Sequence, residues 1–233
     1  MFRQFRQKAK QRLHGYLRQE AGLASRNIDL TRQHKATAES AALVDQYMSM
    51  AKSYPDKFSL LRAALAQVEI QGLHCEFGVY QAETINFMAS LIPGEIHGFD
   101  SFKGLPEDWR VGHEKGTFAT QDLPLVRDNV RLHPGWFEDS IPPFMEQHAG
   151  PVAFLHLDAD LYSSTQTVLE CFRDRIVAGT VIQFDEFFNY PGWQEGEYKA
   201  FAEFCAKYRA KPHYFGYTGD DEQVAVKIVQ IAS

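Results

Sequence analysis

Two pairs of acidic residues follow apolar runs in the second half of the chain. Asp158 and Asp160 end the segment LHLDADLY, and Asp185 and Glu186 follow GTVIQF. If both runs are parallel strands, their carboxyl ends meet at the edge where open α/β sheets bind ligands. Four carboxylates gathered there repel one another unless a cation neutralises them, and an all-oxygen set favours Mg²⁺. The alternative is that these acids cap the helices that follow them.

A glycine ends an earlier apolar segment. The sequence HCEFGVY places Glu76, Gly78 and Tyr80 just before a helical pattern that begins near Ala82. Glycine lets the backbone approach a ligand closely, and the following helix offers free N–H groups. Because GxGxxG is absent, the segment favours a ligand without a dinucleotide pyrophosphate, and NAD binding is the less favoured alternative. By itself, the segment is also compatible with an ordinary turn from strand to helix.

Two further segments favour a nucleoside ligand. Asp100 ends the segment IHGFD, about 20 residues beyond the glycine turn, where α/β nucleotide-binding proteins place the carboxylate that accepts both ribose hydroxyls. We therefore assign Asp100 and the adjacent Ser101 to ribose binding. Trp136 and Phe137, in LHPGWFED, are of the type that flanks an adenine ring. The alternatives are a loop or capping role for the aspartate and a core role for the aromatic residues.

The elements that must position these residues alternate in character after residue 72. Short apolar runs are separated by helix-length amphipathic stretches, which is typical of βαβ units and a parallel sheet. Strands are predicted at 73–78, 95–99, 130–133, 152–158 and 180–185. Helices are predicted at 82–91, 163–175 and 195–209. The segments HYFGYTG and QVAVKIVQI predict a terminal antiparallel hairpin.

The residues before the first strand predict two helices. Residues 40–52 and 56–70 carry apolar residues at helical spacing, with Asp56 as a candidate N-cap. Residues 25–38 are polar and aperiodic, so we expect a loop there. The predicted organisation is a basic arm and linker at 1–38 and one domain at 39–233. A long loop rich in glycine, proline and polar residues is predicted at 101–124, and such loops usually carry function.

Composition excludes several classes of protein. The chain has 233 residues, 45% of them hydrophobic and 23% charged, which is typical of one globular domain. A net charge of -6 argues against a nucleic-acid partner. The absence of a long apolar run and of a secretory signal predicts a cytoplasmic protein. Three cysteines without CxxC spacing indicate neither a disulfide framework nor a zinc site.

The first twenty residues are different in character. Residues 1–20 hold six Lys or Arg against the single acid Glu20, and their apolar residues fall on roughly one helical face. We expect a solvated arm or an arm exchanged between the two copies of a homodimer. Contact with a membrane surface is the less favoured interpretation.

Taken together, the segments EFGVYQAET, HGFDSFKGLP, LHPGWFEDSIPPF, LHLDADLYSST and FDEFFNYPGWQEGEYKAF resemble the macrocin O-methyltransferase family. These are class I methyltransferases that act on sugars of macrolide and aminocoumarin natural products. The resemblance extends over about 40–230 and implies a Rossmann-like α/β fold, with seven mostly parallel strands, an antiparallel last strand and helices on both faces. It also implies Mg²⁺ bound by Asp158, Asp185 and Glu186. Glu186 stands where family members carry a second Asp, and the part before the sheet is shorter here.

The resemblance implies S-adenosylmethionine (SAM) as the cofactor. We place its ribose on Asp100, its amino-acid moiety near Glu76 and Gly78, and its adenine against Trp136 and Phe137. Tyr80, Ser101 and Asp158 complete the predicted cofactor contacts.

The predicted reaction methylates a hydroxyl of a small, sugar-containing acceptor, with Mg²⁺ on Asp158 orienting that hydroxyl and Asp160 as the general base. A catechol, an amine or a surface-glycan precursor are alternative acceptors. A catalytically silent binding protein is disfavoured, because it has no reason to keep four mutually repelling carboxylates. His156 is predicted to be a buried strand residue rather than a base.

Overall fold

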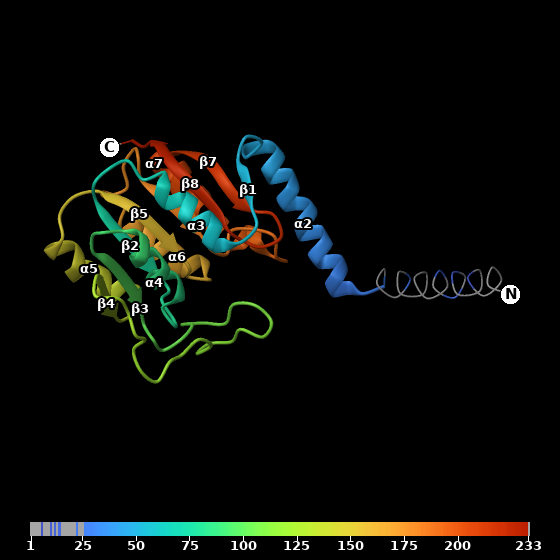
Figure 1. Cartoon of the computed structure of the whole chain (residues 1–233), viewed down its shortest axis with the longest axis horizontal. Helices are drawn as coiled ribbons and strands as arrows, with labels where there is room; N and C mark the ends of the chain where they lie inside the picture. Colours follow the sequence, from blue (N-terminus) through green and yellow to red (C-terminus); the bar gives the residue numbers. More distant parts are fainter. Residues whose placement is uncertain are drawn as a thin grey trace.

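An eight-stranded sheet forms the centre of the molecule (Figure 1), in the order β1-β7-β8-β6-β5-β2-β3-β4. Its strands are β1 Lys52–Tyr54, β2 Leu73–Phe77, β3 Ile96–Asp100, β4 Val130–Pro134, β5 Val152–Leu157, β6 Val181–Phe184, β7 Lys211–Thr218 and β8 Val224–Gln230. Strand β8 is antiparallel to β6 and β7, and every other neighbouring pair is parallel. The predicted parallel sheet and terminal hairpin are confirmed. The short strand β1, which pairs with β7, adds one strand to the seven expected.

This computed structural model describes residues 26–232 and, nearer the N-terminus, Arg6, Lys10, Arg12, His14 and Gly22. Most of the predicted basic arm therefore lies outside the described residues. Its proposed contacts with a membrane surface or a second copy stay predictions, as does the domain boundary near residue 39. Among the described residues, no helix combines the length and apolarity needed to span a membrane.

Helices cover both faces of the sheet. They are α2 Ile28–Tyr47, α3 Lys57–Ala66, α4 Glu83–Leu91, α5 Phe137–Gln147, α6 Tyr162–Cys171, the short 3₁₀ helix η1 Trp193–Glu195 and α7 Glu197–Tyr208. Successive side chains of a buried strand point to opposite faces of the sheet, so the core has two layers. Phe154 and Val181 pack with residues of α3 and α4, whereas their neighbours Leu155 and Ile182 pack with residues of α5, α6 and α7.

Two predictions about helices were wrong. Residues 25–38 are not a loop, because α2 begins at Ile28, where the Asn27 side chain accepts hydrogen bonds from the N–H groups of Asp29 and Leu30. Helix α5 was not predicted, since its two prolines are usual signs of a helix break. Its buried residues Ile141 and Phe144 stabilise it against the sheet.

Candidate active site

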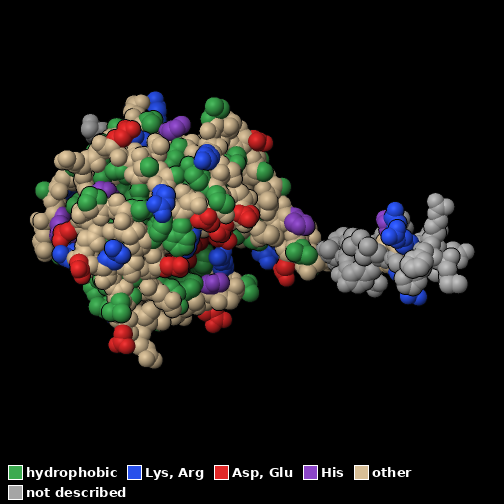
Figure 2. All heavy atoms as spheres, viewed as in Figure 1, with side chains coloured by type: hydrophobic (Ala, Val, Ile, Leu, Met, Phe, Trp, Pro, Cys, Tyr) green, Lys and Arg blue, Asp and Glu red, His purple; other side chains and the backbone are tan. Residues whose placement is uncertain are grey.

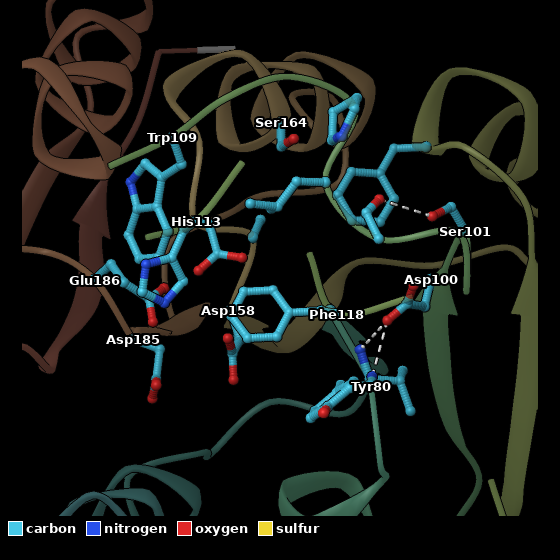
Figure 3. A pocket seen from close by; sticks show the side chains of 18 of the residues that line it. Tyr80, Asp100, Ser101, Trp109, His113, Phe118, Asp158, Ser164, Asp185 and Glu186 are labelled. Atoms are coloured by element: carbon cyan, nitrogen blue, oxygen red, sulfur yellow. Dashed lines mark hydrogen bonds between the residues drawn. The ribbon is translucent and has the colours of Figure 1, made fainter. Parts of the chain in front are cut away.

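A cavity of about 760 Å³ opens at the carboxyl ends of the central parallel strands. Each of the strands β2 to β6 contributes a lining residue at or just beyond its last position, namely Gly78, Asp100, Trp136, Asp158 and Asp185. The predicted long loop is confirmed as a segment without helix or strand, and it contributes further lining residues. Acidic side chains gather near the middle of the face seen in Figure 2. Figure 3 shows this cavity at close range.

Gly78 allows β2 and β5 to approach each other at the cavity floor. Its φ is +90°, and a Cβ atom there would lie 1.7 Å from the carbonyl oxygen of Asp158. The following residues Val79 and Tyr80 donate their N–H groups to Oδ2 of Asp100, each at 2.8 Å. The carboxylate of Asp100 therefore stabilises the turn between β2 and α4, which is the loop role that the sequence left open as an alternative.

Asp100, Ser101, Trp136 and Phe137 all line the cavity, as predicted. The Oδ1 atom of Asp100 accepts a third hydrogen bond, from the N–H of Phe102 at 2.7 Å. Phe137 begins α5 and packs edge-on against Phe77 with 5.5 Å between ring centroids, so it belongs partly to the core. The contacts of these four residues with ribose and adenine stay predictions.

Glu76 does not line the cavity. Its side chain is fully buried, and Nδ1 of His156 lies 2.8 Å from its Oε1 atom. On the other side of the imidazole, Nε2 lies 3.6 Å from Oδ1 of Asp185. Burial lowers the pKa of His156, but the carboxylates of Asp185 and Glu76 outweigh this and raise it to about 10. A direct contact between the Glu76 side chain and SAM therefore finds no support, whereas the buried structural role of His156 does.

The four predicted carboxylates lie together. Oxygen atoms of Asp158, Asp160 and Glu186 lie within 4.8 Å of one another, and Asp158 forms a second such group with Asp185 and His156. The predicted metal ligands Asp158, Asp185 and Glu186 are thus spread over two overlapping groups. Oε2 of Glu186 is buried without a hydrogen-bond partner and is available for a hard divalent cation, whereas Oδ1 of Asp185 faces Nε2 of His156 at 3.6 Å.

The surroundings of the four carboxyl groups shift their pKa values in different directions. Burial raises the pKa of both Asp158 and Glu186 well above the usual range. The second cause is the charge of Asp185 for Asp158, and the charge of Asp158 for Glu186. Burial raises the pKa of Asp160 to about 7, although the Arg110 charge opposes this. Burial also acts to raise the pKa of Asp185, but His156 and Lys57 outweigh it and lower the value. Asp185 is therefore the carboxylate best stabilised as an anion.

Several lining or supporting residues were not predicted. Lys57, in the first turn of α3, places its Nζ atom 3.6 Å from Oδ2 of Asp185. The buried Glu197, at the start of α7, accepts hydrogen bonds from the N–H of Glu186 and the hydroxyl of Thr165, both at 3.0 Å. Lys57 has no local sequence signal, because it reaches the site only through packing of α3. Glu197 lies in the family-like segment FDEFFNYPGWQEGEYKAF, which was the available signal for it. Trp109, Arg110 and His113 lie in the predicted loop, which was the one available signal for them.

Comparison with known proteins supports a methyltransferase family. The family model described as Macrocin-O-methyltransferase (TylF) matches residues 4–210. The chain is 29% identical to 8-demethyl-8-(2,3-dimethoxy-alpha-L-rhamnosyl)-tetracenomycin-C 4'-O-methyltransferase of Streptomyces olivaceus, over 48% of this chain and 51% of that protein. It is 27% identical to demethyldecarbamoylnovobiocin O-methyltransferase of Streptomyces niveus, over 43% of this chain and 45% of that protein. The chain thus spans about half the length of the curated relatives it matches.

Solved structures show the same fold. The calicheamicin methyltransferase CalS11 aligns with a TM-score of 0.57 and 23% identity, over 73% of this chain and 77% of that one. The O-methyltransferase NovP aligns with a TM-score of 0.58 and 22% identity, over 73% of this chain and 78% of that one. Because the family model matches far more than half of its residues, this chain belongs to the macrocin-O-methyltransferase (TylF) family.

Proposed function

We propose that this protein is a SAM-dependent O-methyltransferase that acts on a hydroxyl of a sugar or sugar-containing small molecule. The observation that carries the proposal is one cavity with two chemically different halves (Figure 3). Tyr80, Asp100 and Ser101 lie on one side, and Asp185 and Glu186 lie on the other. Family membership and the sugar-bearing compounds named for the Streptomyces relatives support the assignment.

The half around Asp100 suits the cofactor. SAM supplies a methyl group on a sulfonium, which any nucleophilic oxygen in line with it can accept. In our proposal Asp100 and Ser101 bind the ribose, the backbone at Gly78 and Tyr80 faces the amino-acid moiety, and Trp136 with Phe137 contacts the adenine. Gly78 and Tyr80 both line the cavity, and their N–H groups already donate to the carbonyl of Phe99 and the carboxylate of Asp100.

The acidic half suits the acceptor. Mg²⁺, when bound by Asp158, Asp185 and Glu186, would lower the pKa of an acceptor hydroxyl. Asp160 accepts the proton of that hydroxyl while the oxygen takes the methyl group, so S-adenosylhomocysteine (SAH) and a methyl ether are the products. Burial raises the pKa of Asp160 to about 7, the direction that suits a base, and Mg²⁺ bound beside it would act to lower that pKa. Lys57 and His156 keep Asp185 anionic beside it.

Ligand binding and product mass test the proposal. SAH at about 100 times its dissociation constant should stabilise the protein by roughly 2.7 kcal/mol, a melting shift on the order of 5–10 °C for a chain of this size, whereas NAD should give none. Incubation with SAM and a panel of nucleotide-linked sugars, free sugars, catechols and amines should add one methyl group to a sugar. A protein free of co-purified ligand that shows no shift with SAM or SAH would exclude the function. Methylation of only a catechol or amine would exclude the sugar acceptor.

A further inference from the structure

We infer that Trp109, held in place by Arg110 and Glu222, forms the acceptor-binding wall of the cavity. The inference deepens the proposed function and rests on it for the identity of the acceptor. It assigns a role to the long segment between β3 and β4, whose residues Trp109, Arg110 and His113 line the cavity. None of these residues has a part in the cofactor contacts described above.

Arg110 joins this segment to the turn between β7 and β8. Its Nη1 atom donates to both carboxylate oxygens of Glu222, each at 3.0 Å. The guanidinium also lies 3.9 Å from the ring centroid of Trp109 and 5.1 Å from that of Tyr190. The side chains of Arg110 and Glu222 are only 34% and 20% exposed, so this contact is partly shielded from water. Arginine alone combines a planar group that stacks on rings with donors for a carboxylate.

Glu222 and Tyr190, the two residues that Arg110 contacts outside its own segment, are themselves held by the rest of the protein. The carbonyl oxygen of Glu222 accepts a hydrogen bond from the N–H of Phe187 at 3.0 Å, directly after Glu186 in the chain. Tyr190 is 6% exposed and belongs to the hydrophobic core. Arg110 therefore joins the segment between β3 and β4 to the segment that carries Asp185 and Glu186. Through this contact, the position of Trp109 is fixed relative to the acidic half of the cavity.

A tight turn fixes the orientation of the Trp109 ring. The N–H of Trp109 donates to the carbonyl of His113 at 3.0 Å, and the N–H of His113 donates to the carbonyl of Arg110 at 2.7 Å. The rings of Trp109 and His113 meet edge to face with 5.2 Å between centroids. In Figure 3 both rings lie on the side of Asp185 and Glu186, away from Asp100.

This pairing of a flat ring with carboxylates matches the chemistry of a pyranose. One face of such a sugar presents C–H groups that pack on an aromatic ring, and its edge presents hydroxyls that bind to oxygen ligands. Trp109 would set the height of the sugar above the carboxylates and so select which hydroxyl reaches Asp160. Arg110 is a positioning residue, because it acts through Trp109.

The test compares Trp109→Ala, Trp109→Phe, Arg110→Ala and Arg110→Lys, with Arg131→Ala as the matched control. Arg131 makes an ion pair of 2.9 Å with Glu95, and both side chains are about half exposed outside the cavity. Three quantities are measured: the SAH dissociation constant, the hydrogen–deuterium exchange of residues 103–122, and the KM of the acceptor. TDP-rhamnose, the substrate named for one structural relative, is the first acceptor probe, followed by the other sugars of the panel.

We expect these substitutions to change the KM of the acceptor without changing the affinity for SAH. Trp109→Ala and Arg110→Ala should raise the acceptor KM about three- to tenfold, the range of one aromatic contact, and leave SAH affinity unchanged. The acceptor KM of Trp109→Phe should stay close to that of the parent protein, because phenylalanine keeps a flat ring. The KM of Arg110→Lys should rise as in Arg110→Ala, since lysine lacks the planar guanidinium group. Exchange at 103–122 should rise in both Arg110 variants and stay unchanged in Arg131→Ala, because the Arg131 side chain contacts the backbone at Asp128 and Val130, beyond this window.

Each contrary result is informative. An unchanged KM in Trp109→Ala would overturn the wall assignment, and unchanged exchange in Arg110→Ala would overturn the positioning role. If SAH binds but no sugar of the panel is methylated, the proposed sugar acceptor fails and the wall assignment fails with it. The exchange measurement still decides the role of Arg110 in that case, because it requires no acceptor.

Discussion

At the residue scale, neighbouring charges give four similar carboxylates different properties. Asp185 lies 3.6 Å from both Lys57 and His156, and its pKa is lowered. Asp160 faces Arg110 at longer range, and burial raises its pKa to about 7. The structure therefore separates a carboxylate held as an anion from one that exchanges a proton near neutral pH.

Asp158 and Asp160 should respond differently to substitution, although one residue separates them. Asp158→Ala should weaken Mg²⁺ binding and abolish turnover, with partial recovery at high Mg²⁺ if the other ligands still bind it. Asp160→Asn should keep SAH and Mg²⁺ affinity and lose roughly 10²–10⁴-fold in kcat, the usual value of a positioned base. Calorimetric titration with Mg²⁺ and initial rates check both.

Three outcomes contradict these roles. Loss of Mg²⁺ affinity in Asp160→Asn would make Asp160 a metal ligand, consistent with its position within 4.8 Å of Asp158 and Glu186. Normal turnover of that variant would remove the base assignment. An enzyme that stays fully active in the presence of chelators would remove the metal from the mechanism.

Gly78→Ala should destabilise the protein by more than about 2 kcal/mol and abolish SAH binding, because the added Cβ meets the Asp158 carbonyl. Gly150→Ala is the matched control. Gly150 also has a positive φ, of +98°, but no atom lies within 4 Å of its Cβ position. Gly150→Ala should lower the free energy of unfolding only by the strain of a positive φ, roughly 1–2 kcal/mol. Equal free energies of unfolding for the two variants, measured in urea, would show that the approach of β5 does not matter.

At the scale of elements, one asparagine connects α2 to the segment after β6. Asn189 accepts hydrogen bonds from Gln33 at 2.6 Å and Thr37 at 2.8 Å, and it donates its N–H to Ser40 at 2.9 Å. Its φ of +65° is in the left-handed region, which asparagine tolerates better than most residues. Packing of α2 therefore supports the segment that carries Asp185 and Glu186.

Asn189→Ala and Asn189→Gly separate the hydrogen bonds from the backbone conformation. Both variants lose the side-chain contact with Thr37, so both should increase hydrogen–deuterium exchange in the second half of α2. Alanine also pays for the left-handed conformation, so its free energy of unfolding should be about 1 kcal/mol lower than that of the glycine variant. If α2 exchanges as in the parent protein in both variants, Asn189 does not anchor the helix.

At the scale of the whole molecule, the site depends on one edge of the sheet. Among the residues that the structure describes, every one that lines the cavity falls between Lys57 and Glu186. We therefore predict that removing residues 1–20 leaves SAH affinity unchanged, because the deleted segment precedes all of them. Equilibrium dialysis with SAH and circular dichroism check this prediction. A truncated protein that is folded yet no longer binds SAH would show that the N-terminal residues are part of the site.

The strand and helix patterns of the sequence predicted seven of the eight strands and the edge of the sheet at which the site lies. Alternating strand and helix patterns are local signals, and parallel strands necessarily bring Gly78, Asp100, Asp158 and Asp185 to the same edge. Capping by Asn27 and the burial of α5 over its two prolines were not visible in the pattern, because side-chain capping and packing overrode the local propensities.

Only the tertiary structure decided how the side chains divide their roles. Glu76 and Asp100 both lie at strand ends, yet Glu76 points into the core toward His156 while Asp100 faces the cavity. Lys57 and Arg110 reach the site from segments that are distant in sequence from Asp158 and Asp185, and Glu197 reaches it from the helix that follows Glu186. Charge and hydrogen-bond partners depend on distances of a few ångström between such elements, and no local pattern contains those distances.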